Sequence, residues 1–364
     1  MSAENLSAEN PSADELPLAD RLARQIASGG PISVAYYIGE ANQHYYATRD
    51  PLGADGDFTT APEISQMFGE LVGLALADVW MRSGRRPEAA YVELGPGRGT
   101  LAADALRAME RAALASKAHL VETSPSLRDR QSALLPHVIH HDSIDSLPDQ
   151  GPLLVVANEF FDALPVRQCI RVGDEWRERV VIAREEAGRF IPVAGYRRIE
   201  SGLPPMANEA PEGAIIESPI VGAGIAYALA HRIARQGGAA ILIDYGYEGP
   251  ALGDTLQAVK AHKFADPFAD PGEVDLTTHV DFTVLGNMAR QAGLRVHGPV
   301  GQGDFLRQLG IDARADQLAR SAPARAQNVE IARHRLTDKA EMGTLFKAMA
   351  WTHPDWADPA GFGK

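Results

Sequence analysis

The feature that most constrains the fold of this chain is a glycine-rich turn between an apolar strand and a helix. Residues 89–94 are a short apolar run, residues 95–99 read Gly-Pro-Gly-Arg-Gly, and residues 100–115 have a helical pattern. Glycines at such a junction allow a sharp turn and let a ligand approach the backbone closely. Amides at the start of the helix favour a polar or anionic group. The junction predicts either a ligand site or a purely structural turn.

The rest of the chain repeats this strand and helix alternation. Further apolar strands are predicted at residues 118–122, 138–141, 153–157, 239–244, 295–300 and 343–350, and helices at 60–84, 125–135, 220–235 and 281–292. Short apolar strands that alternate with helices are typical of an α/β fold with a parallel, doubly wound sheet. Residues 166–193 instead alternate apolar and charged side chains, which is the period of antiparallel strands exposed on one face.

These patterns predict one enlarged fold with additions. We expect a disordered acidic tail at 1–15, an N-terminal helical cap at 16–84, a core at 85–165 and 237–364, and an inserted β-rich subdomain at 166–236. Helices are expected at 16–27 and 32–38, and loops at 45–58 and 252–273. Thr60 and Glu63 form a predicted capping box at the start of the helix that follows them, with Pro62 just inside it.

Composition excludes several functional classes. The chain has 35 Lys and Arg against 48 Asp and Glu, a net charge of −13, which argues against broad coating of a nucleic-acid backbone. No uncharged apolar run is long enough to span a membrane. Cys169 is the only cysteine and has no partner for an internal disulfide. His140 and His141 lack a third ligand at suitable spacing, so no metal site is expected.

The glycine turn has the spacing of one particular cofactor class. Gly95, Gly97 and Gly99 follow Glu93 by two, four and six residues. A dinucleotide fingerprint would place its third glycine at Thr100, and a phosphate loop would continue with Gly-Lys-Ser/Thr. The spacing instead resembles motif I of class I S-adenosylmethionine (SAM) methyltransferases.

Acids follow the next two strands. Glu122 ends the second strand, where a carboxylate can accept both hydroxyl protons of a ribose, or can cap the helix that follows. Asp142 ends the third strand, where an acid can bond an adenine amino group, or can lie in solvent.

The fourth and fifth strands end on groups suited to a cationic acceptor. Asn158, Glu159 and Asp162 follow one strand, and Asp244 ends the other. Two carboxylates can hold a guanidinium through charge-assisted bonds. Alternatively, Asp162 caps a helix and Glu159 binds only the cofactor. No Pro-Pro follows Asn158, which argues against a nucleic-acid base as the substrate.

A last acidic cluster spans residues 275–281. His279 could act as a base or orient a substrate there, or could be an ordinary loop histidine.

Four segments together resemble one family. They are GDFTTAPEISQMFGELVG at 56–73, VELGPGRGTL at 92–101, NEFFDALP at 158–165 and DLTTHVDF at 275–282. In this order they resemble the MidA-like family of SAM-dependent methyltransferases, over about residues 18–350. The mitochondrial members of that family are complex I assembly protein-arginine methyltransferases.

The resemblance implies a fold, a cofactor and roles for residues. It implies a class I methyltransferase (Rossmann-like) core with an N-terminal helical extension and an insertion near the substrate, and SAM as the cofactor. The residues expected to bind SAM are Thr60, Pro62, Glu63, Glu93, Gly95, Gly97, Glu122, Asp142 and Asn158. Glu159, helped by Asp162 or Asp244, is expected to hold the acceptor arginine, with His279 also on the substrate side.

The resemblance also implies a partner, which is a protein with an accessible arginine. Nucleic-acid partners and a membrane span are not expected, and the oligomeric state is left open, with a dimer as one option. The N-terminal residues lack the pattern of a transit peptide, so a cytoplasmic bacterial homologue is expected. Two other functions stay open, namely a SAM-binding assembly factor with little or no catalysis and a methyltransferase for a small molecule.

Overall fold

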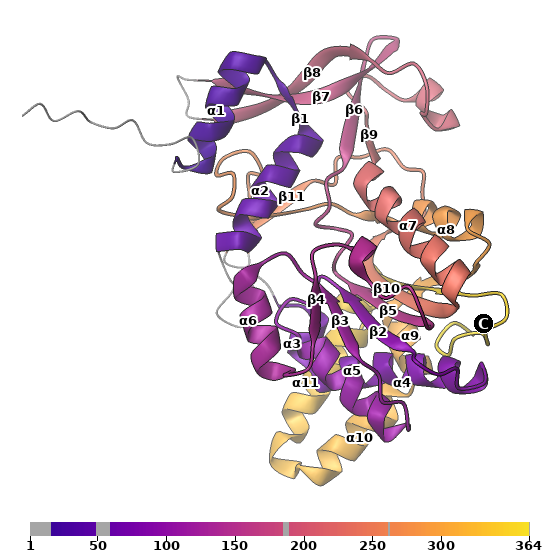
Figure 1. The fold of residues 1–364 in the computed structure, drawn as a ribbon. Coiled ribbons are helices and arrows are strands. Elements are labelled where there is room, and N and C mark those ends of the chain that lie inside the picture. Colours follow the sequence, from indigo (N-terminus) through magenta and orange to yellow (C-terminus); the bar gives the residue numbers. More distant parts are fainter. Residues whose placement is uncertain (1–15, 49–58, 185–188, 261–262, 364) are drawn as a thin grey trace, which may run out of the picture.

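The largest element of the fold is an eight-stranded sheet. The computed structural model describes residues 16–48, 59–184, 189–260 and 263–363 (Figure 1). The sheet contains β2 (Ala90–Leu94), β3 (Ala118–Val121), β4 (Ile139–His141), β5 (Leu153–Asn158), β10 (Gly238–Tyr247), β14 (Val280–Asp281), β15 (Arg295–Gly301) and β16 (Phe346–Thr352). Its order is β15-β16-β10-β5-β2-β3-β4, and β14 pairs with the end of β10. The five strands from β4 to β10 are parallel, and β16 runs antiparallel to both of its neighbours. The predicted α/β class is confirmed.

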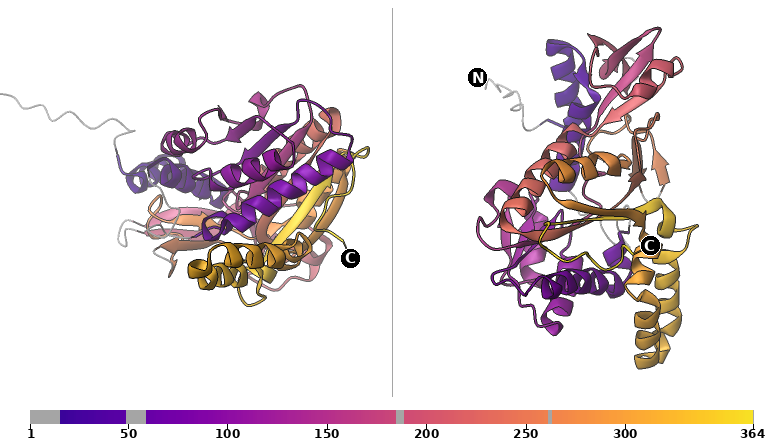
Figure 2. Two further views of the ribbon diagram at one scale, coloured as in Figure 1. Left: turned by 90° about the horizontal axis from the view of Figure 1, so that it is seen from below. Right: turned by 90° about the vertical axis from the view of Figure 1, so that its right-hand side faces the viewer.

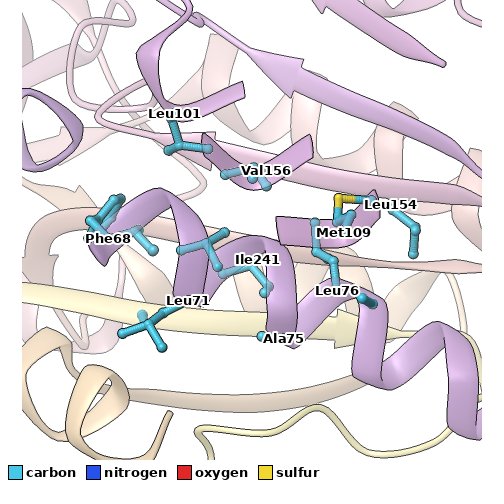
Figure 3. Packing of buried hydrophobic residues seen from close by; sticks show 14 of the residues in the cluster. Phe68, Leu71, Ala75, Leu76, Leu101, Met109, Leu154, Val156 and Ile241 are labelled. Atoms are coloured by element: carbon cyan, nitrogen blue, oxygen red, sulfur yellow. The ribbon is translucent and has the colours of Figure 1, made fainter. Parts of the chain in front are cut away.

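Helices cover both faces of this sheet. One face carries α4 (Gln66–Arg82), α5 (Thr100–Arg111), α9 (Gln302–Gln308), α10 (Ile311–Ser321) and α11 (Ala326–Thr337), and the other carries α7 (Ile220–Gln236) and α8 (Phe282–Gln291). The remaining short elements are α3 (Ala61–Ile64), α6 (Pro125–Leu134), α12 (Met342–Leu345) and the 3₁₀ turns at Ile144–Ser146, Pro205–Glu209 and Pro323–Arg325. Figure 3 shows the apolar face of α4 over the sheet, with Phe68, Leu71 and Ala75 near Val156 and Ile241. Burial of these side chains is the main stabilising contribution at this interface.

Two smaller sheets lie outside the core. The first contains β1 (Ile32–Ser33), β6 (Arg167–Val172), β7 (Glu175–Arg184), β8 (Arg189–Arg198) and β9 (Ile215–Ser218), all antiparallel. Helices α1 (Leu18–Gly29) and α2 (Val34–Thr48) pack beside it. The second is the three-stranded sheet β12 (Lys263–Ala265), β11 (Gln257–Lys260) and β13 (Asp275–Thr277). The right-hand view of Figure 2 places the β6–β9 sheet at the opposite end of the molecule from α10 and α11.

The N-terminal segment is joined to the later additions rather than standing apart. Strand β1 pairs with β7, so residues from the N-terminal segment complete the sheet formed by residues 167–218. Helix α7 also falls within residues 166–236, but its apolar side packs on the core sheet. The strands and the helix of this region therefore belong to different layers.

Three local predictions are wrong. Residues 252–273 were expected to be a loop, yet they contain β11 and β12. The capping box at Thr60 does not form, because Thr60 is the N-cap of the short helix α3 but its side chain makes no capping hydrogen bond. Ser65 caps α4, and its hydroxyl accepts from the Met67 amide at 3.2 Å. Glu63 instead accepts a hydrogen bond from the Thr100 hydroxyl at 2.5 Å, which ties α3 to the start of α5. The second N-terminal helix is also longer than expected and continues to Thr48.

Two other expectations fall outside the described residues. The predicted tail at 1–15 does so entirely, and the predicted loop at 45–58 does so from residue 49 onward. In the described part of the chain, no helix is both long and apolar enough to cross a membrane.

Candidate functional site

The glycine turn opens onto a cavity of about 910 Å³ at the carboxyl edge of the core sheet. Gly95 and Gly97 have φ of 60° and 53°, in the left-handed region that favours glycine. A Cβ atom on Gly95 would lie 2.9 Å from Cδ2 of Phe160. The turn therefore needs glycine both for its backbone conformation and for its closeness to the end of β5.

Most of the predicted site residues line this cavity. Those that do are Thr60, Pro62, Glu63, Glu93, Gly95, Gly97, Glu122, Asn158, Glu159, Asp162 and His279. They come from α3, the ends of three parallel strands and the loop before β14. The fold thus brings together residues that are more than 200 positions apart in sequence.

The carboxylate of Glu122 is held by backbone hydrogen bonds to one of its two oxygens. Its Oε1 accepts from the amides of Thr123 and Ser124, each at 2.8 Å, while its Oε2 has only a 3.4 Å contact with Nε2 of Gln131. Burial raises the pKa of Glu122, and the hydrogen bonds partly offset this. The second oxygen is available to a hydroxyl in the cavity.

Gln131 was not identified from sequence, because it lies inside the predicted helix 125–135. Its buried side chain donates to the carbonyl of Gly97 at 2.6 Å, and its Oε1 lies 2.9 Å from Nε2 of His140. Gln131 therefore links the glycine turn with the ends of β3 and β4.

Glu93 is buried behind the turn. The Tyr91 hydroxyl donates to its carboxylate at 2.6 Å. Burial raises the pKa of Glu93 to about 8, although the Tyr91 bond acts in the opposite direction. This carboxyl group is therefore largely protonated at neutral pH.

Glu159 has an unusual backbone at the end of β5. Its φ is 50°, a strained value for a residue with a side chain, and its amide donates to the carbonyl of Ile243 at 2.9 Å. The side chain turns toward α3, and its Oε1 accepts from the Ala61 amide and from Nδ2 of Asn158, both at 3.2 Å. Burial and the nearby Asp162 raise the pKa of Glu159 to about 8. Strained backbone of this kind is concentrated at functional sites.

Two buried oxygens on the cavity wall lack partners among the described residues. They are Oδ1 of Asn158 and Oδ1 of Asp162, whose side chains are at least nine-tenths buried. Burial raises the pKa of Asp162, while a hydrogen bond from Tyr245 lowers it. An unpaired buried acceptor costs free energy, so both positions favour a ligand that donates hydrogen bonds.

A third carboxylate, missed as a site residue, joins this wall from β13. Asp275 is 4% exposed, and its Oδ1 accepts from the Tyr46 hydroxyl at 2.8 Å. The sequence pattern marked the 275–281 cluster but singled out only His279 within it. Tyr46 could not have been found, because its helix is distant in sequence and carries no local signal.

His279 lies on the same side of the cavity. Its backbone amide donates to the Thr255 hydroxyl at 2.9 Å, and its ring meets the ring of Tyr245 edge-on at 5.5 Å. Burial lowers the pKa of His279, which favours the neutral imidazole.

Two predicted residues do not line the cavity. The carboxylate of Asp244 accepts from the amides of Phe161, Asp162 and Tyr245 at 2.9–3.2 Å, and so holds the backbone after β5. Asp142 is 88% exposed in its side chain and pairs with Arg128 at 2.6 Å. No cluster of metal-ligating side chains is present in the part of the chain that the structure describes.

Known proteins share this fold and much of this sequence. A sequence model of the S-adenosyl-L-methionine-dependent methyltransferases matches residues 71–300. The chain belongs to this family. The predicted resemblance to SAM-dependent methyltransferases is thereby confirmed.

Individual methyltransferases are similar to this chain over nearly its whole length. The protein arginine methyltransferase NDUFAF7 homolog of Drosophila melanogaster, named as mitochondrial, is 38% identical over 92% of this chain and 84% of its own. The mitochondrial protein arginine methyltransferase NDUFAF7 of Homo sapiens is 33% identical over 95% of this chain and 85% of its own. A crystal structure from Burkholderia thailandensis bound to S-adenosyl-homocysteine has a TM-score of 0.81 and 28% identity, and covers 95% of this chain and 92% of that one.

The side chains of this methyltransferase fit SAM. The glycine turn leaves its backbone open to the cavity, Oε2 of Glu122 accepts only a long hydrogen bond of 3.4 Å from Gln131, and Oδ1 of Asn158 has no hydrogen-bond partner among the described residues. SAM carries ribose hydroxyls and amino groups that can supply these hydrogen bonds. The turn and Glu122 would therefore hold the cofactor, and Glu159, Asp162 and Asp275 line the same cavity.

Proposed function

We propose that this methyltransferase transfers a methyl group from SAM to an arginine side chain of a protein. The observation that carries the proposal is the buried, unpartnered Oδ1 of Asp162 on a wall shared with Glu159 and Asp275. A guanidinium carries a positive charge and five N–H donors, which satisfy several carboxylate oxygens at once. The names of the relatives support the same acceptor.

The chemistry divides between cofactor and protein. SAM supplies the methyl group on a sulfonium that leaves readily. The protein orients the guanidinium nitrogen toward that methyl group and removes its proton, because a free guanidinium is a poor nucleophile. Glu159 and Asp162 suit this task, since burial raises the pKa of both carboxyl groups toward the neutral range.

The finer identity of the acceptor rests on resemblance alone. A subunit of respiratory complex I is the acceptor that the mitochondrial members imply, and we carry it over as a proposal. A cytoplasmic location likewise stays a prediction.

The test uses Glu159→Gln, which keeps the size of the side chain and removes its ability to ionise and accept a proton. We expect methyl transfer from labelled SAM to protein to fall by about 100-fold or more, because a general base contributes about that much. S-adenosyl-homocysteine should still bind within about threefold of wild type in calorimetry, since Glu122 and the turn are unchanged. Glu110→Gln, an exposed change on α5, is the matched control.

Three outcomes would contradict the proposal. Label that enters only small molecules would show a different acceptor class. Cofactor binding without any transfer by the wild type would favour an assembly factor. Transfer by Glu159→Gln at wild-type rates would remove Glu159 from the mechanism.

A further inference from the structure

The three-stranded sheet β12-β11-β13 presents one face to the catalytic cavity. Residues paired directly across antiparallel strands have side chains on the same face. Gln257 pairs with Thr277, and Val259 pairs with both Asp275 and Phe264. All five of these residues line the cavity.

The opposite face of this sheet is its anchor. Ala258 pairs with both Leu276 and Ala265, so these three share the other face. Ala258 and Leu276 are fully buried in the apolar cluster that includes α1 and α2, and Ala265 packs against it. The cavity-facing side chains are therefore held in place by a fixed core rather than by a free loop.

The cavity face changes from acidic to apolar across the strands. Asp275 on β13 is 4% exposed, and Phe264 on β12, at the opposite edge of the sheet, is 82% exposed. Neighbouring strands lie about 4.8 Å apart, so the acidic and apolar strands are separated by about 10 Å. Leu345 of α12, 50% exposed, is a second exposed apolar side chain on the cavity wall.

The exposed side chain of Phe264 on the cavity wall can pack against a bound partner. Exposed apolar surface that adjoins a binding site commonly marks the place where a partner packs. The occupant must also deliver a cation to the carboxylates deeper in the cavity. An extended polypeptide does both, because its residues i and i+2 point to the same side about 7 Å apart, and the long arginine side chain covers the remaining distance of about 3 Å to the carboxylates.

We propose that Phe264 determines which acceptor sequences are preferred, by packing against an apolar side chain two residues from the methylated arginine. The acceptor is then an extended segment in which Leu, Ile, Val, Met or an aromatic residue lies two positions before or after the arginine. This inference rests on the proposed arginine methylation and adds a sequence preference to it.

The first experiment determines which arginines are methylated. Peptides cut from a bacterial proteome after lysine are incubated with deuterated SAM and wild-type protein, and methylated arginines are located by mass spectrometry. We expect apolar residues to be enriched at the −2 or +2 position. Methylated arginines without this enrichment overturn the role of Phe264 and leave the proposed function standing, whereas no methylated arginine in any peptide overturns both.

The second experiment assigns the preference to Phe264. Two synthetic peptides differ only by Leu or Ser at the enriched position, and kcat/KM is measured for wild type and Phe264→Ser. We expect the variant to lose about tenfold on the Leu peptide, comparable to burying part of an apolar side chain, and little on the Ser peptide. The affinity for S-adenosyl-homocysteine should not change.

Two matched variants complete the test. Tyr196→Ser removes an aromatic side chain that is 94% exposed on β8 and is not on the cavity wall, so it should behave as wild type. Phe264→Leu keeps an apolar group and should restore most of the Leu preference. An unchanged Leu-to-Ser ratio in Phe264→Ser would overturn the proposal.

Discussion

The pKa of Glu159 predicts how turnover depends on pH. In the protein without acceptor this carboxyl group is protonated below about pH 8, because burial and Asp162 raise its pKa. A guanidinium binds the ionised form, so kcat/KM for an acceptor peptide at saturating SAM should rise with pH up to about 8. The kcat should vary less, because a bound cation lowers the carboxyl pKa. A kcat/KM that is flat between pH 6 and 8 would contradict this assignment.

The raised pKa of Glu93 predicts how the free energy of unfolding depends on pH. Its pKa is raised from 4.5 to about 8 in the folded protein, so folding favours the protonated form. This contribution is complete below pH 4.5 and is lost as the pH rises to about 8, on the order of a few kcal/mol at most. Glu93→Gln should flatten the fall of unfolding free energy over this range, as measured by urea titration. Glu110→Gln on the surface should leave the slope as in wild type.

Strand ends explain which site residues could be predicted from sequence. Glu122 and Glu159 follow strands of a parallel sheet, so their position at the ligand edge follows from local pattern. Asp244 was predicted to end a strand, but β10 continues past it to Tyr247, and its carboxylate accepts three backbone amides instead of lining the cavity. Which way a strand-end carboxylate turns depends on amides from another segment, and no local pattern contains that information. Gln131 and Tyr46 lie within helices, and only tertiary packing brings them to the site.

At the scale of elements, the contact between α4 and α5 depends on a missing side chain. A Cβ atom on Gly73 would lie 2.5 Å from the carbonyl oxygen of Ala105. We expect Gly73→Ala to lower the free energy of unfolding by about 1–3 kcal/mol, because backbone atoms cannot yield as a flexible side chain can. Gly224→Ala in α7 is the matched control, since nothing lies within 4 Å, and it should stabilise by about 0.5–1 kcal/mol. Urea titrations of the two variants should therefore shift in opposite directions.

Some strands could be predicted from sequence patterns and others could not. Strands β2, β5 and β10 are fully or largely buried, and their continuous apolar runs made them recognisable. Strands β11 and β12 are short and sit among Ala, Asp and Pro, so composition favoured a loop. Strand β11 pairs with β12 on one side and, on the other, with β13, which begins ten residues after β12 ends. Pairing partners of this kind are not visible in a local window.

At the scale of the whole molecule, the additions to the core form much of the cavity side where we propose that the acceptor binds. Helix α2, the loop after β5 and strand β13 meet beside the carboxylates of Asp162 and Asp275. The N-terminal segment reaches this point because β1 pairs with β7 and its helices pack in the same apolar cluster. The core alone provides the turn for the cofactor. The acceptor wall is complete only when these additions are in place.

Asn42 of α2 is the point where these parts are joined. Its side chain donates to the carbonyls of Ala163 and Leu276 at 2.8 and 2.7 Å, and accepts from the Leu276 amide at 3.1 Å. Asn42→Leu would leave these groups unpaired in a buried position, so we expect a loss of about 3 kcal/mol or more in the free energy of unfolding. The exposed Asn287→Leu on α8 is the control and should change stability by less than about 0.5 kcal/mol.

The Asn42→Leu variant also tests whether the acceptor and the cofactor are held by different parts of the site. Ala163 follows Asp162 in the loop after β5, and Leu276 follows Asp275 on β13. Both backbone segments that Asn42 fixes therefore carry carboxylates that we propose bind the acceptor. The glycine turn and Glu122 are held instead by Gln131. In the Asn42→Leu protein that remains folded, KM for the acceptor peptide should therefore rise by about tenfold, in line with the cost of misplacing catalytic groups. The affinity for S-adenosyl-homocysteine should stay within about threefold of wild type. Equal losses on both would mean that Asn42 acts only through global stability, and that acceptor and cofactor positions are not held independently.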